Sequence, residues 1–394
     1  MVIPSFSLGR SPKILFGAGT RRELATEMGR FGRRALVVTG HASLRRSPGW
    51  KEWQETWKDA GLTVRELAVS GEPEAAWVDA AVKQLAGTGL ELVVAIGGGS
   101  VLDAGKALSA MLPLNESVLP YLEGAGQGRS HPGTKLPFLA VPTTAGTGTE
   151  ATKNASLRRL GPEGFKNSLR HEALVPDVAL VDPELTLTCP PALTAACGMD
   201  ALAQLLESYL SPRAFPLTDV LAENGLAAVR DHLLPAFESG QTNLEARTGM
   251  AYAALLSGIT LANAGLGIIH SLSSVLGGLR DIPHGVICGA LLAPGMRRNL
   301  DQLRQAGAEA LPALRKHATA GALLSGRVVH SWEEGCEALL NQLDAWTRSL
   351  EIPRLGAYGL TAEETDAIAA KTPNRNNPVR LEPQDIRDIL IQAR

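Results

Sequence analysis

The sequence predicts a protein in two parts, an α/β part with a doubly wound, mostly parallel sheet followed by an all-helical part. Short apolar runs alternate with amphipathic stretches up to about residue 185. From about residue 186 the chain is rich in alanine and leucine at helical spacing and almost free of strand-like runs. The turn Cys189-Pro190-Pro191 lies at this change, and 394 residues are enough for two domains with full cores. We therefore expect domains over 1–185 and 186–394.

Six apolar runs in the first part are expected to be strands. Several lack polar alternation, which is typical of strands buried on both faces of a parallel sheet. Amphipathic segments lie between them, and in one the apolar residues from Trp77 to Leu85 recur at helical spacing. Strands that alternate with helices indicate a doubly wound α/β arrangement. The expected strands cover residues 14–17, 35–39, 63–69, 92–96, 138–141 and 178–181.

The second part is expected to consist of helices. Its clearest stretches of helical spacing cover residues 217–235, 243–264, 302–324 and 333–350. The cleft between an α/β part and a helical part is a common place for a small ligand. We therefore expect the functional site between the two parts.

The composition argues against several classes of partner. The formal net charge is −2 and there is no basic run of five or more residues, so nucleic acid is not expected. Apolar runs are interrupted well short of a membrane span, and the N-terminus lacks the pattern of a signal peptide. The cysteines show no CxxC or paired spacing, which predicts reduced thiols in a cytoplasmic protein. They are Cys189, Cys197, Cys288 and Cys336.

A glycine-rich turn follows the fourth expected strand. In AIGGGSVLDAGKAL, residues 95–108, three consecutive glycines separate a buried strand from a helix. Gly98 and Gly99 let the backbone approach a ligand closely, and the amides at the helix start, with the Ser100 hydroxyl, suit a pyrophosphate. The stretch does not match GxGxxG, so the nucleotide interpretation depends on its position between strand and helix.

A threonine-rich stretch follows the fifth expected strand. One interpretation of AVPTTAGTGTEAT, residues 140–152, is that its hydroxyls line a cofactor channel. The other is a loop in which Thr149 caps a helix with Glu150 in the first turn. The residues alone do not decide between the two. The hydroxyls belong to Thr143, Thr144, Thr147, Thr149 and Thr152.

Two histidines stand fourteen residues apart in the apolar, glycine-rich segment GLGIIHSLSSVLGGLRDIPHG, residues 265–285. The pair Gly277-Gly278 is suited to end a helix, and Pro283 to begin the next. His270 is then expected near the end of one helix and His284 at the start of another, with both imidazoles aimed at one point. Two unrelated histidines are the simpler alternative.

An upstream helix overturns that simpler alternative. Asp200 and Gln204 are four residues apart in GMDALAQLLES, residues 198–208, and therefore share one helix face. Aspartate and histidine suit Fe²⁺ or Zn²⁺ as ligands. Combined with His270 and His284, this face predicts a divalent-metal site.

Five motifs together resemble the iron-containing (group III) alcohol dehydrogenase family. They match in order and spacing over nearly the whole chain, down to Asn377-Pro378: GGGSVLDAGK, PTTAGTGTE, PDVALVDPEL, GMDALAQLLESYLS, and NAGLGIIHSLSSVLGG with the following IPHG. The resemblance implies a dinucleotide-binding domain, a helical metal-binding domain, and hydride transfer between NAD(P)(H) and a small alcohol or aldehyde. It also implies a homodimer or a larger homo-oligomer.

The resemblance assigns roles residue by residue. The residues that match the pyrophosphate-binding turn are Gly98, Gly99, Ser100 and Asp103. Those that match positions lining the cofactor are Thr143, Thr144, Thr152, Asn154 and Lys166. Asp200, His270 and His284 match three metal ligands, which leave open coordination positions for catalysis. These ligand types accept either Fe²⁺ or Zn²⁺.

Two positions depart from the family pattern. The family usually has a histidine where this chain has Gln204, whose amide oxygen is a weaker donor than imidazole. The site then has three ligands plus water, or Gln204 binds through its oxygen. Many members also carry a histidine at the position of Ser274, so a proton would instead pass through water, the ribose hydroxyls or Ser274.

A third difference concerns the choice of cofactor. NAD-preferring members tend to place an acidic residue after the second strand, where this chain has Gly40. Without a carboxylate a 2′-phosphate is not repelled, and Ser43, Arg45 or Arg46 is available to bind it. We therefore expect NADP(H) to be preferred over NAD(H); the alternative is that these arginines only face solvent.

Other functions on the same fold are less well supported. A lyase similar to dehydroquinate synthase would need several basic residues for a phosphorylated substrate, and residues 255–295 offer only Arg280. A metal-free reductase of the maleylacetate type is compatible with Gln204. A non-catalytic nucleotide-binding module would leave Asp200, His270 and His284 without a role.

Overall fold

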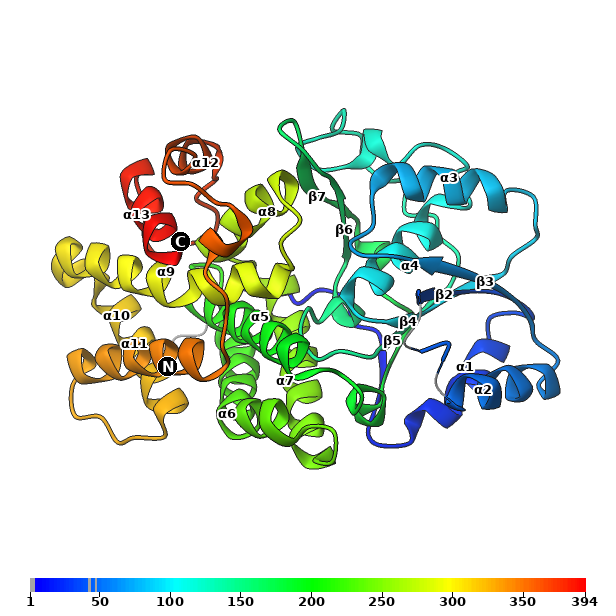
Figure 1. Cartoon of the computed structure of the whole chain (residues 1–394), viewed down its shortest axis with the longest axis horizontal. Helices are drawn as coiled ribbons and strands as arrows, with labels where there is room; N and C mark the ends of the chain where they lie inside the picture. Colours follow the sequence, from blue (N-terminus) through cyan, green and yellow to red (C-terminus); the bar gives the residue numbers. More distant parts are fainter. Residues whose placement is uncertain (1–3, 42–43, 47) are drawn as a thin grey trace.

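The N-terminal part of the chain contains a six-stranded parallel sheet, as the computed structural model shows (Figure 1). The structure describes residues 4–41, 44–46 and 48–394. The strand order is β1-β8-β5-β4-β2-β3. The strands are β1 (Lys13–Phe16), β2 (Arg34–Gly40), β3 (Thr63–Val69), β4 (Leu92–Gly97), β5 (Phe138–Pro142) and β8 (Val178–Val181). All six expected strands are therefore present, and every pairing between them is parallel.

Helices cover both faces of this sheet, as its apolar strands require. The short α1 (Leu24–Gly29) and the longer α2 (Pro48–Asp59) pack on one face. On the other face lie α3 (Ala75–Leu85) and α4 (Gly99–Met111). β4 is buried along its whole length because it lies between these two layers. The sheet is doubly wound, as predicted.

The direction of strand order reverses between β2 and β4. β3 follows β2 outward, and the chain then returns to place β4 on the other side of β2. In an open parallel sheet, ligands bind at the carboxyl ends of the strands that flank such a reversal. Gly40 ends β2 and Gly97 ends β4, so these two positions mark the expected cofactor site.

An antiparallel hairpin that the sequence did not indicate projects beyond the main sheet. It consists of β6 (Asn154–Arg159) and β7 (Phe165–Arg170). The amide of Gly161, in its turn, donates a hydrogen bond to the carbonyl of Gly278 at 3.2 Å. The hairpin thus joins the sheet part to the helical part (Figure 1).

The second part of the chain is helical from Pro191 onward, with α5 at its centre. Nearly all of α5 is buried because α6, α7 and α9 pack around it. The helices are α5 (Pro191–Leu210), α6 (Pro216–Ser239), α7 (Leu244–Ala264), α8 (Ile268–Leu279), α9 (His284–Ala306), α10 (Leu311–Ser325), α11 (Trp332–Ser349), α12 (Thr365–Lys371) and α13 (Pro383–Ala393). Short 3₁₀ segments occur at Thr20–Glu23, Leu119–Tyr121, Thr149–Ala151, Glu172–Leu174, Pro183–Thr186, Gly307–Ala310 and Leu355–Tyr358.

Two expectations about the helices are wrong in detail. The stretch 302–324 is not one helix, because α9 ends at Ala306 and Gly307 adopts a left-handed φ of 72° before α10 begins. His270 lies in the first turn of α8 rather than near the end of a helix. Gly277 and Gly278 remain inside α8, which ends one residue later.

Within the described residues no single helix is long and apolar enough to cross a bilayer. Only α7 and α8 taken together meet the length and composition of a span, and they are bent by 99° relative to each other.

Candidate metal and cofactor site

Glu207 fixes both the start of α8 and the orientation of His270. Its carboxylate is buried on α5 and accepts hydrogen bonds from the amides of Ile269 at 2.6 Å and His270 at 3.3 Å. These amides belong to the first turn of α8, where the helix leaves them without internal partners. The same carboxylate lies 2.6 Å from Nδ1 of His270. A carboxylate at this nitrogen leaves Nε2 of His270 free for a metal ion.

Four side chains from three helices converge beyond Nε2 of His270. Oδ1 of Asp200, on α5, lies 3.3 Å from Nε2 of His270 and 3.5 Å from Nε2 of His284, the first residue of α9. Sγ of Cys288, one turn further along α9, lies 3.8 Å and 3.7 Å from the same two nitrogens. All four donor atoms lie within 4.8 Å of one another. The structure thus brings together the three ligands predicted from the resemblance and adds a cysteine to them.

The ionisable groups of this cluster stabilise one another's charged forms. Burial opposes the charged form of every member, but the neighbouring charges outweigh it. They raise the pKa of His270 well above its ordinary value and also raise that of His284. The pKa values of Asp200 and Cys288 are lowered by the two histidines despite burial. Anionic and imidazole donors that converge in a buried place are the donor set that Fe²⁺ or Zn²⁺ requires.

Gln204 lies beside this cluster, and its amide is engaged by protein groups. Nε2 donates a hydrogen bond to Oδ1 of Asp200 at 3.3 Å, and Oε1 accepts one from the hydroxyl of Ser257 at 2.7 Å. The side chain is buried. Gln204 lies on the predicted face of α5, because its side chain reaches the same Asp200 carboxylate as the two histidines.

Ser274 is exposed on α8, one turn after His270. Its hydroxyl donates a hydrogen bond to the carbonyl oxygen of His270 at 2.9 Å. The hydroxyl therefore lies on the helix that carries a candidate ligand, but it is tied to the backbone.

The glycine turn between β4 and α4 depends on the absence of side chains. A Cβ on Gly97 would lie 2.6 Å from the side chain of Val101, and one on Gly99 would lie 2.5 Å from Cγ2 of Thr147. Both distances are too short for a carbon–carbon contact. Gly98 is the residue before α4, whose first turn also contains the half-buried Ser100. This turn offers the cradle of backbone amides that a pyrophosphate requires.

Ionisable side chains are buried beneath this turn. The Oδ1 atom of Asp103 is buried without a hydrogen-bond partner among the described residues, and burial raises the pKa of this carboxyl to about 7. Lys106, one turn away, has its pKa lowered by burial to about 8. Its ammonium donates to the carbonyl oxygens of Thr149, Thr152 and Asn154. Lys106 therefore fixes the loop after β5, and the orphaned Asp103 oxygen fits a cofactor hydroxyl.

The threonine-rich loop joins the glycine turn to the metal helix. The amide of Thr143 donates to the carbonyl of Gly97 at 2.9 Å. A Cβ on Gly146 would lie 2.9 Å from Cβ of Cys197, which is three residues before Asp200 on α5. The predicted cofactor threonines Thr143, Thr144 and Thr147 are half-buried here, whereas the Thr152 hydroxyl accepts from Nζ of Lys106 at 3.0 Å. Thr149 does not act as a helix cap, because it is the first residue of a 3₁₀ turn whose N-cap is Gly148 and which has no side-chain cap hydrogen bond, although Glu150 does lie in the first turn.

The β6–β7 hairpin carries Lys166 to the same region. The Lys166 ammonium donates to Oε1 of Glu72 at 2.6 Å, and Cδ of Lys166 lies 2.9 Å from the position of a Cβ on Gly277 of α8. Asn154, at the start of the hairpin, is half-buried. Lys166 therefore lies between the sheet part and α8, as its assigned role near the cofactor requires.

The positions expected to select the cofactor lie at the end of β2. Among the described residues, the nearest atom to a Cβ on Gly40 is Cγ2 of Val101 at 3.9 Å, an ordinary van der Waals contact. Nε of Arg45 donates to the hydroxyl of Thr39 at 2.9 Å, and its guanidinium lies 3.4 Å from the Glu66 carboxylate. Arg46 is exposed. Ser43 lies outside the described residues.

Four residues that contribute to this region were not found from the sequence. Cys288 follows His284 by four residues and Glu207 follows Asp200 by seven, so helical spacing places each on the face of a predicted ligand. This helical spacing was the sequence signal available for Cys288 and Glu207. Lys106 and Glu72 gave no such signal, because their partners belong to distant segments.

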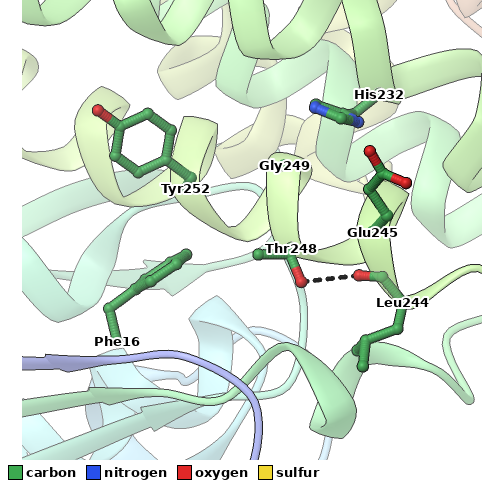
Figure 2. A pocket seen from close by; sticks show the side chains of 7 residues that line it. All are labelled: Phe16, His232, Leu244, Glu245, Thr248, Gly249 and Tyr252. Carbon is green, nitrogen blue, oxygen red and sulfur yellow. Dashed lines mark hydrogen bonds between the residues drawn. The ribbon is translucent and has the colours of Figure 1, made fainter.

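A separate hollow near these helices contains none of the candidate site residues. Figure 2 shows this space of about 540 Å³ between β1 and the first half of α7. The ring of Phe16 meets that of Tyr252 edge-on at 6.0 Å, and the Thr248 hydroxyl is bonded to the Leu244 carbonyl. The hollow is a shallow gap between packed elements. Among the described residues, no set of ionisable side chains converges on it.

Comparison with known proteins agrees with this geometry. Residues 11–183 match the family described as iron-containing alcohol dehydrogenase, and residues 194–394 match the C-terminal region of the Fe-containing alcohol dehydrogenase family. Alcohol dehydrogenase 4 of Saccharomyces cerevisiae (strain ATCC 204508 / S288c) is 32% identical over 390 residues, which are 97% of each chain. An NADPH-dependent butanol dehydrogenase of Clostridium saccharobutylicum is 30% identical over 364 residues, 91% of this chain and 88% of the relative.

Solved structures give the same result. The crystal structure of a 1,3-propanediol oxidoreductase superposes with a TM-score of 0.88 at 29% identity, and the match covers 99% of this chain and 100% of the other. These matches confirm the predicted resemblance. The motifs agree with it, as does the combination of a parallel sheet with a helical part. The chain belongs to the iron-containing alcohol dehydrogenase family.

Proposed function

We propose that this chain is a metal-dependent alcohol dehydrogenase or aldehyde reductase that uses NAD(P)(H). The observation that carries the proposal is the convergence of Asp200, His270 and His284 on one point, with Oδ1–Nε2 distances of 3.3 and 3.5 Å. The threonine-rich loop after β5 contacts the glycine turn through Thr143 and packs on α5 at Cys197, three residues before Asp200. A cofactor held at the turn would therefore lie against the metal ligands.

When bound, a divalent ion at this site supplies Lewis acidity toward the substrate oxygen, and the nicotinamide supplies or accepts the hydride. Asp200, His270 and His284 would hold the ion, and Glu207 orients His270 for that task. Gln204 would orient the Asp200 carboxylate through its amide. Ser274, exposed beside His270, is the side chain we assign to passing a proton to solvent.

The chain's own residues also account for the cofactor. Gly98 and Gly99 give the pyrophosphate access to the amides at the start of α4, and Ser100 and Asp103 would hold its neighbouring hydroxyls. Further positions that would line the cofactor are Thr143, Thr144, Thr147, Thr152, Asn154 and Lys166. The half-buried Lys166–Glu72 pair fixes the last of these at the face of α8.

We propose that NADP(H) is preferred over NAD(H). Gly40 supplies no carboxylate at the end of β2, so a 2′-phosphate is not repelled there. Arg45, half-buried beside Thr39, and the exposed Arg46 provide positive charge close by. Ser43 stays in the proposal as a further donor. The butanol dehydrogenase relative from Clostridium saccharobutylicum is NADPH-dependent.

Two alternatives are distinguished by the same site. A metal-free reductase of the maleylacetate type would not need four donor atoms within 4.8 Å of one another. A lyase similar to dehydroquinate synthase would need cationic side chains for a substrate phosphate, whereas Arg280 is bonded to the carboxylate of Glu364 at 2.6 Å. The metal-dependent oxidoreductase accounts for both observations.

The proposal includes a cytoplasmic location and a homodimer or larger homo-oligomer. The four cysteines are free thiols, which supports a reducing compartment. Size-exclusion chromatography with light scattering measures the assembly, and a monomer at working concentration would contradict that part.

The substrate class is tested with the purified protein loaded with Fe²⁺ or with Zn²⁺. A panel of short-chain aldehydes is offered with NADPH and, separately, with NADH, and cofactor oxidation is followed by absorbance. We expect reduction of at least one aldehyde, with the higher kcat/KM for NADPH. A tenfold or greater advantage of NADH would contradict the cofactor preference, and no oxidation with any aldehyde would contradict the oxidoreductase.

A further inference from the structure

Cys288 lies inside the metal cluster, at a position that neither the motifs nor the resemblance assigns. Its side chain is fully buried, and Sγ is 3.8 Å from Nε2 of His270 and 3.7 Å from Nε2 of His284. The other three cysteines of the chain do not join this group. The thiol therefore faces the two candidate ligand nitrogens and no solvent.

The distances in the cluster are those of a coordination shell. A regular tetrahedron with metal–ligand bonds of about 2.0–2.3 Å has edges of roughly 3.3–3.8 Å. The four measured edges that link Asp200, His270, His284 and Cys288 are 3.3, 3.5, 3.7 and 3.8 Å. The longer two involve sulfur, whose bond to zinc is the longer one. These are four of the six distances between the donor atoms, and all six are within 4.8 Å.

Two glycines on α9 account for this placement. A Cβ on Gly285 would lie 2.1 Å from the carbonyl oxygen of Ala196, and one on Gly289 would lie 3.1 Å from Cβ of Met199. Both glycines face α5, so the backbones of α9 and α5 come close together next to Asp200. Each glycine directly follows a donor residue, His284 or Cys288, and the i, i+4 spacing carries both donors to the same helix face.

Gln204 does not offer an oxygen to this point. Its amide nitrogen faces Asp200, and its amide oxygen accepts the hydroxyl of Ser257 on α7. A reversed amide would place two acceptor oxygens 3.3 Å apart, at Gln204 and Asp200, which is unfavourable. The i, i+4 pair on α5 thus gives one ligand and one supporting residue, whereas the i, i+4 pair on α9 gives two donors.

We propose that Cys288, and not Gln204, supplies the fourth protein ligand of the metal, which makes an Asp200-His270-His284-Cys288 site. This inference rests on the proposed metal-dependent function. Four is also the number of protein ligands expected from the family pattern. Cys288, one turn after His284 on α9, therefore takes the place of the ligand that α5 lacks at Gln204. Two anionic ligands balance the charge of a divalent ion, and a thiolate favours Zn²⁺ or Co²⁺ over harder ions.

The test uses the metal-free full-length protein titrated with Co²⁺. A cobalt–thiolate bond gives an intense near-ultraviolet charge-transfer band, which we expect for the wild type at one equivalent. Cys288→Ala should remove the band and weaken Zn²⁺ binding by at least about a hundredfold, since loss of a direct ligand exceeds the 10–100-fold of an outer-shell change. Cys336→Ala, a buried cysteine in a different cluster, is the matched control and should retain both. Gln204→Leu should keep the band and lose less affinity than Cys288→Ala.

X-ray absorption of the zinc-loaded wild type gives a readout that does not depend on the folding of any variant. We expect one sulfur at about 2.3 Å from zinc. Metal bound without a sulfur neighbour, or a band that persists in Cys288→Ala, would overturn the Cys288 assignment and leave the metal-dependent function intact. A wild type that binds no divalent ion and reduces aldehydes in excess chelator would instead overturn the proposed function.

Discussion

The glycine turn after β4 and the metal cluster beyond α5 are constructed by opposite means. At the turn, an added Cβ on Gly97 or Gly99 would meet a neighbouring side chain, and the groups we propose to bind the cofactor are backbone amides. In the cluster, the binding groups are side chains on three different helices. The turn is local in the sequence, whereas the cluster draws on positions from Asp200 to Cys288.

This contrast explains why substitutions are tolerated differently in the two regions. A Cβ added at Gly99 would lie 2.5 Å from Cγ2 of Thr147, so the loop or the turn would have to shift. In the cluster, the histidine expected at Gln204 is absent, yet a thiol from α9 lies within the same group of donors. A site made of side chains can change one donor for another from a neighbouring helix, but a site made of backbone cannot.

The largest expected effect comes from removing an imidazole. His270→Ala or His284→Ala should abolish turnover and lower metal affinity by more than about a hundredfold, because each deletes a direct donor. Inductively coupled plasma mass spectrometry of the purified variants and a competitive zinc titration measure this. His330→Ala, an exposed histidine outside the cluster, is the control and should behave as wild type. If His284→Ala keeps the wild-type metal content, then α9 does not contribute His284 to the metal site.

Changing the residue that orients His270 should have the next largest effect. Glu207→Gln keeps the size of the side chain, but the amide cannot accept from both Ile269 and Nδ1 of His270, so one of these bonds is lost. We expect metal affinity to fall about 10–100-fold. Glu238→Gln, an exposed change on α6, provides the matched control. Unchanged affinity in Glu207→Gln would mean that the ring needs no carboxylate to face the metal.

The glycine turn between β4 and α4 is tested by adding a side chain at each of two neighbouring glycines. Gly99→Ala should reduce the free energy of unfolding by about 1–3 kcal/mol, as overpacking does, because its Cβ would lie 2.5 Å from Thr147. Gly98→Ala should cost less, since its nearest contact is Thr144 at 3.3 Å. Urea unfolding of the cofactor-free protein compares the two. If both variants lose the same free energy of unfolding, then contact with the threonine-rich loop is not what requires glycine in the turn.

The smallest effect concerns the cofactor preference. Gly40→Asp should lower kcat/KM with NADPH at least about tenfold relative to NADH, because a carboxylate repels the 2′-phosphate. A new Cβ meets no close contact among the residues that the structure describes, the nearest atom there being 3.9 Å away. Gly40→Asn has the same size without the charge and should shift the ratio much less. If both variants shift it equally, size rather than charge controls the preference.

Much of the fold was predictable because its determinants are periodic and local. The six strands of the sheet are apolar runs, and α7 and α11 agree with the expected helices to within one residue. The β6–β7 hairpin was missed because its residues are half polar, and its contact with Gly278 comes from far along the chain. His270 was placed at the wrong end of its helix because the buried carboxylate of Glu207, not a local cap, starts α8.

The candidate site was predictable only where it follows motifs. Asp200, His270 and His284 stand in segments with clear spacing, and the structure brings them together. Cys288 carried the same i, i+4 signal relative to His284, but the cysteines were compared with one another rather than with the histidines. Glu72 and Lys166 could not be paired from the sequence, because 94 residues separate them and only the hairpin brings them into contact.

The central claim is that the cluster around Asp200 holds a divalent ion needed for hydride transfer. The most direct measurement is the metal content of the purified wild type, combined with aldehyde reduction before chelation, after chelation and after addition of Zn²⁺ or Fe²⁺. We predict about one ion per chain, loss of activity with the ion, and recovery on its return. Full activity in excess chelator, with no metal detected, would contradict the claim.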